Sequence, residues 1–279
     1  MFSRLLVGLD GSPGAEAALT AAITLARRFR STIVLATITD VRVLEAPRLG
    51  GAAPTWVEGM PGVAPDAALA AVMDERSRRL ADAAAARVRA AGLGAELAHA
   101  VGFVEQELLR LATEAEAEAV VVGRRGELTG EPGAIGGTTT FIVRKAPRPV
   151  LVAGEHPSPC ERPVVAYDGG ETSSNALALA ARYAEALQLH LDVVHVSDDA
   201  AAGEAQLAKA AAFLSGLGVA CTTQRLGGDV IAAIAGYIER AGADLLVAGA
   251  HGSRRRAWGL GSHAERLLRA TSVPVIIVR

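Results

Sequence analysis

A short apolar segment that ends in an acidic residue and a glycine decides the fold. It consists of Arg4-Leu5-Leu6-Val7-Gly8-Leu9-Asp10-Gly11, and it returns in the middle of the chain as Arg162-Pro163-Val164-Val165-Ala166-Tyr167-Asp168-Gly169. In both places a run of strand length stops at a turn and an alanine-rich, helix-forming segment follows. The two aspartates are 158 residues apart. The chain therefore carries an internal repeat.

The rest of the chain repeats in the same order. A second apolar run ends at Ile38 in the first copy and at Val196 in the second. Both copies then contain glycines in the same order. Each copy ends with a further apolar run, at 149–153 and 274–278. A stretch rich in proline and charge separates the copies. The sequence predicts two tandem domains, 1–154 and 163–279, joined by a linker at 155–162.

Each copy has the pattern of an α/β domain. Short apolar runs alternate with long helical segments, which is typical of a parallel, Rossmann-like sheet. The strands of the first copy are expected at 4–9, 32–38, 95–101, 118–123 and 149–153. Ser12 is expected to cap the first helix, with Pro13 at its first position, and Thr172 or Ser173 to cap its counterpart. The carboxyl ends of the strands then share one edge, where ligands bind.

Residues 39–65 form the irregular part of the first copy. They contain four Gly and four Pro, with Trp56 and Met60 among the bulky apolar members. A loop of this length is a disordered segment, a packing flap, a lid over a ligand or a surface for a partner. The sequence leaves these alternatives open.

Composition excludes several function classes. The 28 basic and 30 acidic residues give a formal charge of -2, which argues against a nucleic-acid-binding protein. The sequence has no apolar run of transmembrane length, so no membrane partner is expected. Cys160 and Cys221 are far apart and outside any metal-binding motif, which predicts neither a disulfide framework nor a zinc site. A cytoplasmic location is the expectation.

Two glycine-rich loops are the best candidates for chemistry. The first copy has Gly123-Arg124-Arg125-Gly126, then nine residues, then Gly136-Gly137-Thr138, and the second has Gly249-Ala250-His251-Gly252, then eight residues, then Gly261-Ser262-His263. Glycines let the main chain approach an anion, and the free amides of a helix N-terminus attract phosphate. A hydroxyl at the helix start adds a donor. The alternative is an ordinary strand-to-helix turn.

This spacing resembles the ATP-binding signature of the universal stress protein family, and the resemblance covers the chain twice. It implies the strand order 3-2-1-4-5 and an adenine nucleotide, ATP, across the first and fourth strands. By resemblance, Asp10 and Asp168 lie at the base and ribose, the main chain at Ile38 and Val196 meets the adenine edge, and the loop glycines hold the phosphates. The two aspartates are also candidates for Mg²⁺ or for simple helix capping.

The two copies depart from the family pattern in different ways. In the first, Gly137 stands where a hydroxyl is expected, and Glu127 and Glu131 bring negative charge to the loop. The second keeps Ser262 and adds Ser253 and three arginines, 254–256, but its loop is one residue shorter. A charge-assisted phosphate contact is worth about 1.5 to 3 kcal/mol. We therefore expect both sites to bind ATP and the second to be favoured, with His251 and His263 beside its phosphates.

The predicted function is nucleotide-dependent regulation in a stress response. Neither Lys145 nor Lys209 follows a glycine, so the Walker A motif of common NTPases is missing. The alternatives are a slow nucleotide hydrolase or phosphotransferase, and a nucleotide-free scaffold. The closing strands at 149–153 and 274–278 are expected to pair across a pseudo-twofold axis within the chain, and a homodimer of the whole chain stays open.

Overall fold

The computed structural model describes residues 1–45, 67–127, 134–251 and 262–279. The first half contains β1 (Arg4–Leu9), α1 (Pro13–Phe29), β2 (Thr32–Asp40), α2 (Val41–Glu45), α3 (Ala67–Ala90), β3 (Ala95–Gly102), α4 (Val104–Glu114), β4 (Ala119–Val122), α5 (Gly137–Lys145) and β5 (Val150–Val152). The second half contains β6 (Pro163–Ala166), α6 (Glu171–Leu187), β7 (Leu191–Val196), α7 (Ala200–Gly216), β8 (Cys221–Leu226), α8 (Val230–Ala241), β9 (Leu245–Gly249), α9 (Ser262–Ala270) and β10 (Val275–Val278).

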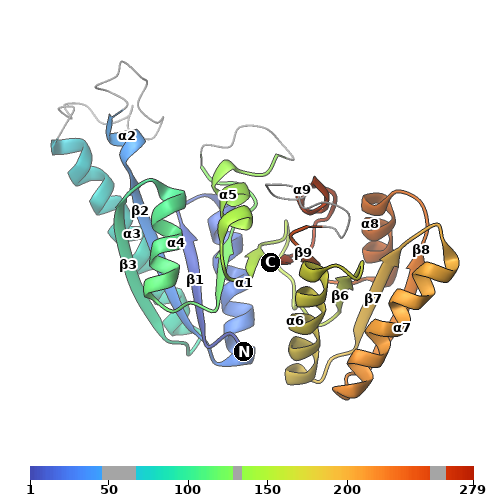
Figure 1. Cartoon of the computed structure of the whole chain (residues 1–279). Coiled ribbons are helices and arrows are strands. Elements are labelled where there is room, and N and C mark those ends of the chain that lie inside the picture. The colour runs from blue at the N-terminus through green and yellow to red at the C-terminus, as the bar shows by residue number, and fades with distance from the viewer. Residues whose placement is uncertain (46–66, 128–133, 252–261) are drawn as a thin grey trace.

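All ten strands join one sheet, in the order β3-β2-β1-β4-β5-β10-β9-β6-β7-β8 (Figure 1). Each half has the predicted order 3-2-1-4-5, and its own strands are parallel. The halves meet where β5 and β10 pair antiparallel, with Ile276 opposite Leu151. The predicted pairing of the closing strands within the chain is confirmed. It covers two edges that would otherwise expose unpaired main-chain groups.

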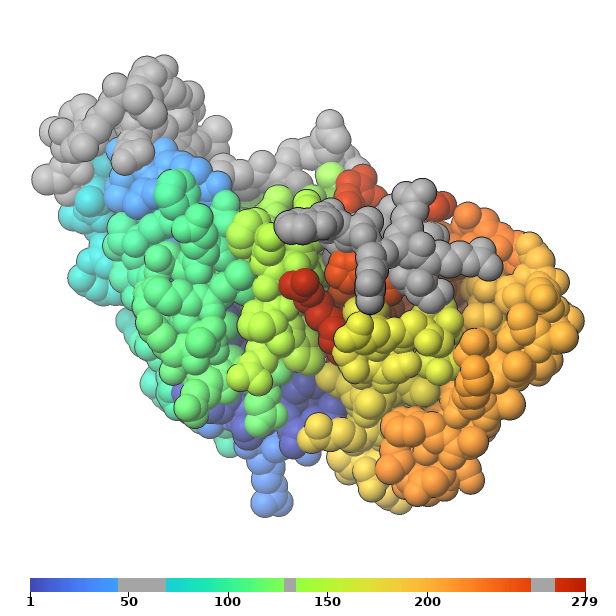
Figure 2. All heavy atoms as spheres, in the orientation of Figure 1, coloured from blue at the N-terminus to red at the C-terminus, as the bar shows by residue number. Residues whose placement is uncertain are grey.

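Helices cover both faces of this sheet, because successive side chains of a strand point to opposite faces. Leu5 and Val7 belong to the buried cluster of one face, which also contains side chains of α1, α3, α6 and α7. Leu6 lies on the other face, with the buried side chains of α4, α5, α8 and α9. In Figure 2 the first half, blue to green, packs against the second, yellow to orange. On each face of the sheet, the buried side chains of both copies therefore form one continuous core.

The first helix starts as the sequence predicts. The Ser12 side chain accepts a hydrogen bond from the Ala15 amide at 3.1 Å, and Pro13 is the first helical residue. The predicted cap of the second copy is wrong, because the cap residue is Gly170, two to three residues earlier, and α6 starts at Glu171. The Ser173 hydroxyl instead donates to the carbonyl oxygen of Gly170 at 3.0 Å, inside the first turn.

The predicted irregular segment starts too early. Residues 39 and 40 complete β2, because Thr39 and Asp40 pair with Val101 and Gly102 of β3, and α2 follows at once. Pairing with a neighbouring strand thus extends β2 beyond its apolar run. Trp56 and Met60 lie outside the described residues. The other predicted strands of the first copy agree with the structure to within one residue at each end.

The side chain of Arg124 connects the two halves through hydrogen bonds outside the sheet. Arg124, just after β4, donates from Nε to the carbonyl oxygen of Ala153 at 3.0 Å and from Nη2 to that of Val273 at 2.7 Å. Its Nη1 donates to the carbonyl oxygen of Leu268 in α9. Burial lowers the pKa of Arg124, and the charge of Glu155 opposes this effect. A half-buried cation of the first half therefore donates to main-chain acceptors of the second.

Candidate functional site

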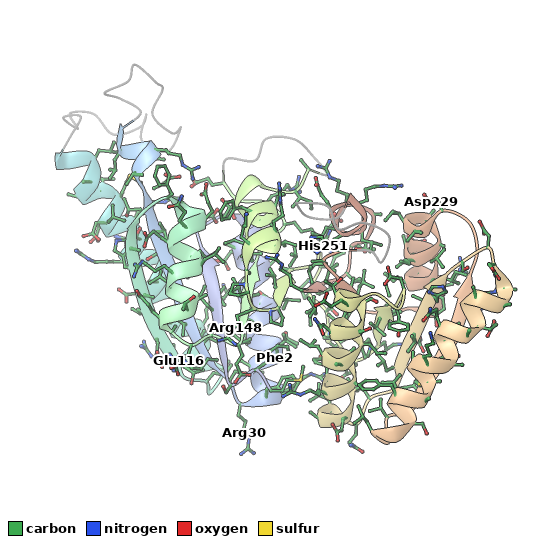
Figure 3. All side chains as sticks on the ribbon, viewed as in Figure 1. Phe2, Arg30, Glu116, Arg148, Asp229 and His251 are labelled. Atoms are coloured by element: carbon green, nitrogen blue, oxygen red, sulfur yellow. The ribbon has the colours of Figure 1, made fainter. Side chains whose placement is uncertain are left out.

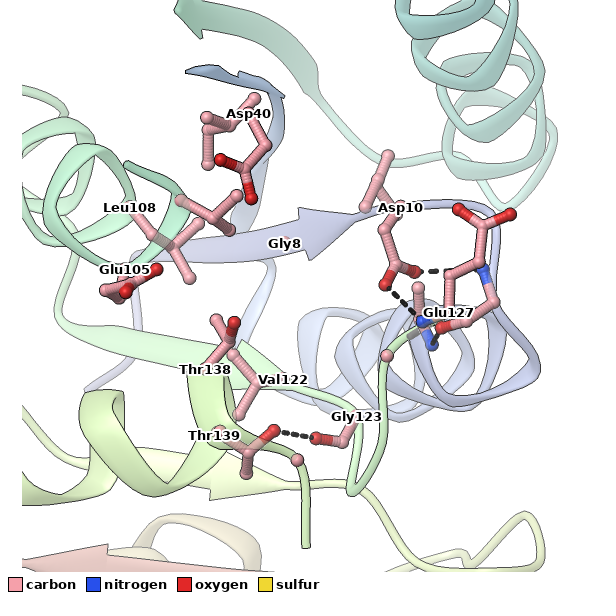
Figure 4. Close-up of a pocket in the computed structure, with 18 of the residues that line it drawn as sticks. Gly8, Asp10, Asp40, Glu105, Leu108, Val122, Gly123, Glu127, Thr138 and Thr139 are labelled. Atoms are coloured by element: carbon pink, nitrogen blue, oxygen red, sulfur yellow. Dashed lines mark hydrogen bonds between the residues drawn. The ribbon is translucent and has the colours of Figure 1, made fainter. Parts of the chain in front are cut away.

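A cavity of about 780 Å³ opens at the carboxyl ends of β1, β2 and β4 (Figure 4). Its floor comes from the strand ends and from the loop that leads to α5, and its walls come from α3 and α4. The volume is in the usual range for small-molecule sites, and the place is the topological switch point of an open parallel sheet. This is where a ligand of an α/β domain is expected.

The predicted residues of the first copy meet in this cavity. All seven line it: Asp10, Ile38, Gly123, Gly126, Gly136, Gly137 and Thr138. They come from four separate segments of the chain. The structure therefore brings all the predicted residues of the first copy together at one cavity.

The carboxylate of Asp10 is fixed by main-chain amides. Its Oδ1 accepts from the amide of Ser12 at 2.9 Å, and its Oδ2 accepts from the amide of Glu127 at 3.1 Å. A β-carbon at Gly126 would lie 2.7 Å from the same Oδ2. Asp10 therefore holds the loop after β4 against the turn between β1 and α1, which is close to the capping role that the sequence left open.

Close packing explains the first glycine of the loop. A β-carbon at Gly123 would collide with the main chain of Gly14 in α1, and one at Gly14 would collide with the main chain of Arg125. None of the cavity glycines of this loop has a positive φ. Their small size lets the loop lie directly on the first turn of α1. The main chain then lines the cavity floor.

Free amides face the cavity at the start of α5. The amide of Gly136 is used, since it donates to the carbonyl oxygen of Arg124 at 2.8 Å, and the Thr139 hydroxyl donates to that of Gly123 at 2.7 Å. In the described part of the chain, the amides of Gly137 and Thr138 have no acceptor, as is normal in the first turn of a helix. A β-carbon at Gly137 would meet nothing within 4 Å. This end of the cavity suits an anion.

The cavity also has an apolar part with a charged rim. Ile38, Leu108 and Val122 lie on the strand and α4 side, and further apolar members are Met73, Leu80 and Phe141. At the rim, Arg42 binds the carboxylates of Asp40 and Glu105, with the closest contacts at 2.8 and 3.0 Å. Hydrogen bonding to Asp40 raises the pKa of Arg42. This part therefore offers an apolar surface for a flat ring.

The walls of the cavity were missed by sequence reasoning. Arg76 and Leu80 come from α3, and Glu105 and Leu108 from α4. The sequence shows that both segments are helical, but it does not show which turn of each lies over the strand ends. The register of a helix on a sheet depends on packing along its whole length.

The second half repeats the arrangement at its own strand ends. β6 lies between β9 and β7, so Asp168, Val196 and Gly249 sit at the carboxyl ends of adjacent parallel strands. The carboxylate of Asp168 accepts from the amide of Gly170 at 2.9 Å. A β-carbon at Gly249 would lie 2.6 Å from the hydroxyl of Thr172. Here too a glycine lets the strand end pack against the first turn of a helix.

His251 is held by its main chain. Its carbonyl oxygen accepts from the Thr172 hydroxyl at 2.6 Å, and Figure 3 shows it at the strand-end side of the second half, away from Arg30 and Glu116. The predicted residues Gly252, Ser253 and Gly261 lie outside the described part of the chain, as do the side chains of Ser262 and His263, whose main chain begins α9.

Within the described ranges, no group of three or more His, Cys, Asp or Glu side chains is placed to hold a metal ion. Among the same residues, no helix combines the length and apolar character needed to cross a membrane.

Comparison with known proteins gives the same picture over the whole chain. The universal stress protein family model matches residues 1–154 and 161–279. Universal stress protein Slr1230 of Synechocystis sp. is 28% identical over 287 residues, which cover 99% of each chain. The crystal structure of a universal stress protein from Archaeoglobus fulgidus has a TM-score of 0.79 at 18% identity, covering 100% of this chain and 99% of that one. Protein PA1789 of Pseudomonas aeruginosa has a TM-score of 0.65 at 16% identity, covering 99% and 92%.

Proposed function

The chain belongs to the universal stress protein family, and from this premise we propose that the cavity of its first half binds an adenine nucleotide, with ATP as the expected ligand. One observation carries the proposal: the seven residues of the first copy that the glycine spacing and the family resemblance singled out line a single cavity at the switch point of the sheet.

Two parts of the cavity suit the two parts of a nucleotide. The apolar surface around Ile38, Leu108 and Val122 fits a purine ring. The amides of Gly137 and Thr138, with the Thr138 hydroxyl, fit phosphate oxygens at the positive end of the α5 dipole. Asp10 lines the same cavity, and we assign its carboxylate oxygens to ribose hydroxyls.

We propose binding and regulation rather than efficient turnover. Among the described residues, the polar side chains that line the first cavity are arginines, carboxylates and hydroxyls, without a histidine or cysteine. The alternative, a hydrolase or phosphotransferase, would use His251 or the arginines at 254–256 of the second site to stabilise a leaving phosphate, and it predicts turnover that disappears when they are replaced. A scaffold without nucleotide predicts no bound ligand after gentle purification.

The remaining expectations complete the proposal. The second site is expected to bind ATP as well, since its strand ends repeat those of the first. We place the domain boundary at the linker 155–162 and the protein in the cytoplasm, acting in a stress response. Because β5 and β10 already pair within the chain, a homodimer would have to use another surface.

The test is to identify the nucleotide that the purified protein releases on denaturation. The wild-type chain is compared with Gly137→Asp and Gly137→Ala by mass spectrometry, each also combined with Gly252→Asp to remove the second site. The position has room for either side chain. The aspartate adds a negative charge at the proposed phosphate end, and the alanine adds only volume. We expect alanine to retain nucleotide and aspartate to lose it. Equal release from both variants would overturn the assignment.

A further inference from the structure

An ion pair inside the cavity has no counterpart in the sequence pattern that located the site. Arg76 of α3 binds the carboxylate of Glu127 with both nitrogens of its fork: Nη1 lies 3.0 Å from Oε2 and Nη2 lies 2.9 Å from Oε1. Nη2 also donates to the carbonyl oxygen of Asp10 at 3.1 Å. Both side chains line the cavity, and each is about one-third exposed, at 31% and 33%.

The surrounding main chain is arranged for this pair. Gly11 has a φ of +83°, and a β-carbon there would lie 3.2 Å from Nη2 of Arg76, so the glycine leaves room for the guanidinium beside Asp10. The amide of Glu127 donates to the carboxylate of Asp10. Arg76, Glu127 and Asp10 therefore join α3, the loop after β4 and the end of β1 at one point.

The carboxylate of Glu127 disfavours an anionic ligand in this cavity unless its ion pair with Arg76 rearranges. A carboxylate beside bound phosphates repels them, whereas a guanidinium fork binds carboxylate and phosphate oxygens with the same geometry. We infer that Arg76 is the side chain that recognises the phosphate chain of the nucleotide, and that Glu127 occupies its guanidinium until the nucleotide arrives. Binding then exchanges one anionic partner of Arg76 for another. This inference rests on the function proposed above.

Among the described residues of the second half, a glutamine takes the corresponding place. Gly169 corresponds to Gly11 and has a φ of +79°, but the side chain beside it is Gln206, whose Oε1 would lie 2.6 Å from a β-carbon at Gly169. A glutamine does not carry the charge that such an exchange requires. The exchange is therefore a property of the first cavity, and Arg76→Gln gives that cavity the residue of the second.

The test measures the dissociation constants of ATP, ADP and adenosine by titration calorimetry, in full-length chains that all carry Gly252→Asp. Glu127→Gln removes the competitor, and Arg76→Gln removes the phosphate-binding group. Matched controls come from the exposed pair Arg79 and Glu75 on α3, which is absent from the cavity lining. Glu75→Gln and Arg79→Gln make the same changes of charge. Melting curves check that every variant is folded.

We expect Glu127→Gln to tighten ATP binding about threefold or more, and Arg76→Gln to weaken it about tenfold or more. Both effects should shrink as salt is added, because they are electrostatic. Adenosine should bind all chains alike, and the control variants should match the parent. Arg76→Lys should restore part of the affinity for ATP.

Two failures are distinguishable. If the parent chain binds ATP and Glu127→Gln leaves the affinity unchanged or weakens it, the exchange is wrong and the nucleotide site stands. If neither ATP, ADP nor adenosine binds the parent or any variant, the proposed function of the first cavity fails, and the exchange fails with it.

Discussion

Removal of the Arg124 side chain should loosen the contact between the two halves of the chain. The guanidinium donates to three main-chain carbonyl oxygens, those of Ala153, Leu268 and Val273, and two of these belong to the second half. In Arg124→Ala all three acceptors lose this donor in a partly buried place. The substitution therefore tests whether the halves are held by more than the β5 and β10 ladder.

The size of the effect follows from these contacts. A hydrogen bond to a charged group contributes about 1.5 to 3 kcal/mol to stability, but such contributions from one side chain do not add. Burial of the guanidinium opposes them, as its lowered pKa indicates. We expect a loss of about 2 to 4 kcal/mol in the free energy of unfolding. Arg124→Lys keeps one positive charge and should lose less.

The assay is urea unfolding followed by far-ultraviolet circular dichroism, with limited proteolysis of the segment at 153–162 as a second readout. Arg148→Ala is the control, because Arg148 is exposed and has no hydrogen bond or ion pair within the ranges that the structure describes. The control should stay within about 0.5 kcal/mol of the wild type. If Arg124→Ala did so too, and the segment were cleaved no faster, the role assigned to Arg124 would be refuted.

Three further predictions concern the sheet, the core and pH. Ile277→Pro removes a main-chain donor from the ladder between β10 and β5, where Ile277 lies opposite Val150, and should cost about 3 kcal/mol or more, seen as a lower melting temperature and faster cleavage between the halves; unchanged values would contradict the paired edge. Tyr183→Phe removes the hydroxyl that donates to the carbonyl oxygen of Cys160 at 2.7 Å and should cost about 1 to 2 kcal/mol in urea unfolding. Hydrogen bonding from Arg4 lowers the pKa of Glu96, so this pair stabilises the fold above pH of about 4.3 and ceases to do so as the pH falls through the lowered pKa. Glu96→Gln should reduce the loss of stability between pH 5 and pH 3, and an identical pH profile would count against the pair.

The repeat explains why so much of the fold could be predicted. Two copies of one pattern predict the same α/β domain twice, the family resemblance supplies the strand order of each, and the mismatch in copy length identifies the variable middle. The ends of the strands were harder to predict. β2 continues to Asp40 because it pairs with β3, and the residues of β3 come more than fifty positions later in the sequence. The cap of α6 was misplaced because a serine in the first turn looks like a cap in sequence.

The residues of the candidate site were also predicted only in part. Spacing identified Asp10 and the loop glycines, because these positions follow strand ends that the fold must bring together. It did not separate a glycine that leaves room for an anion from one that leaves room for main chain, as Gly123 does for Gly14. Nor could it place Arg76, whose position depends on how α3 packs over the strands.

The most direct test of the central claim is a crystal structure of the protein grown or soaked with millimolar ATP. The account predicts a nucleotide in the first cavity, with the purine against Ile38 and phosphate oxygens about 3 Å from the amides of Gly137 and Thr138. A fully occupied nucleotide elsewhere on the chain, with that cavity filled only by solvent or by side chains, would contradict it.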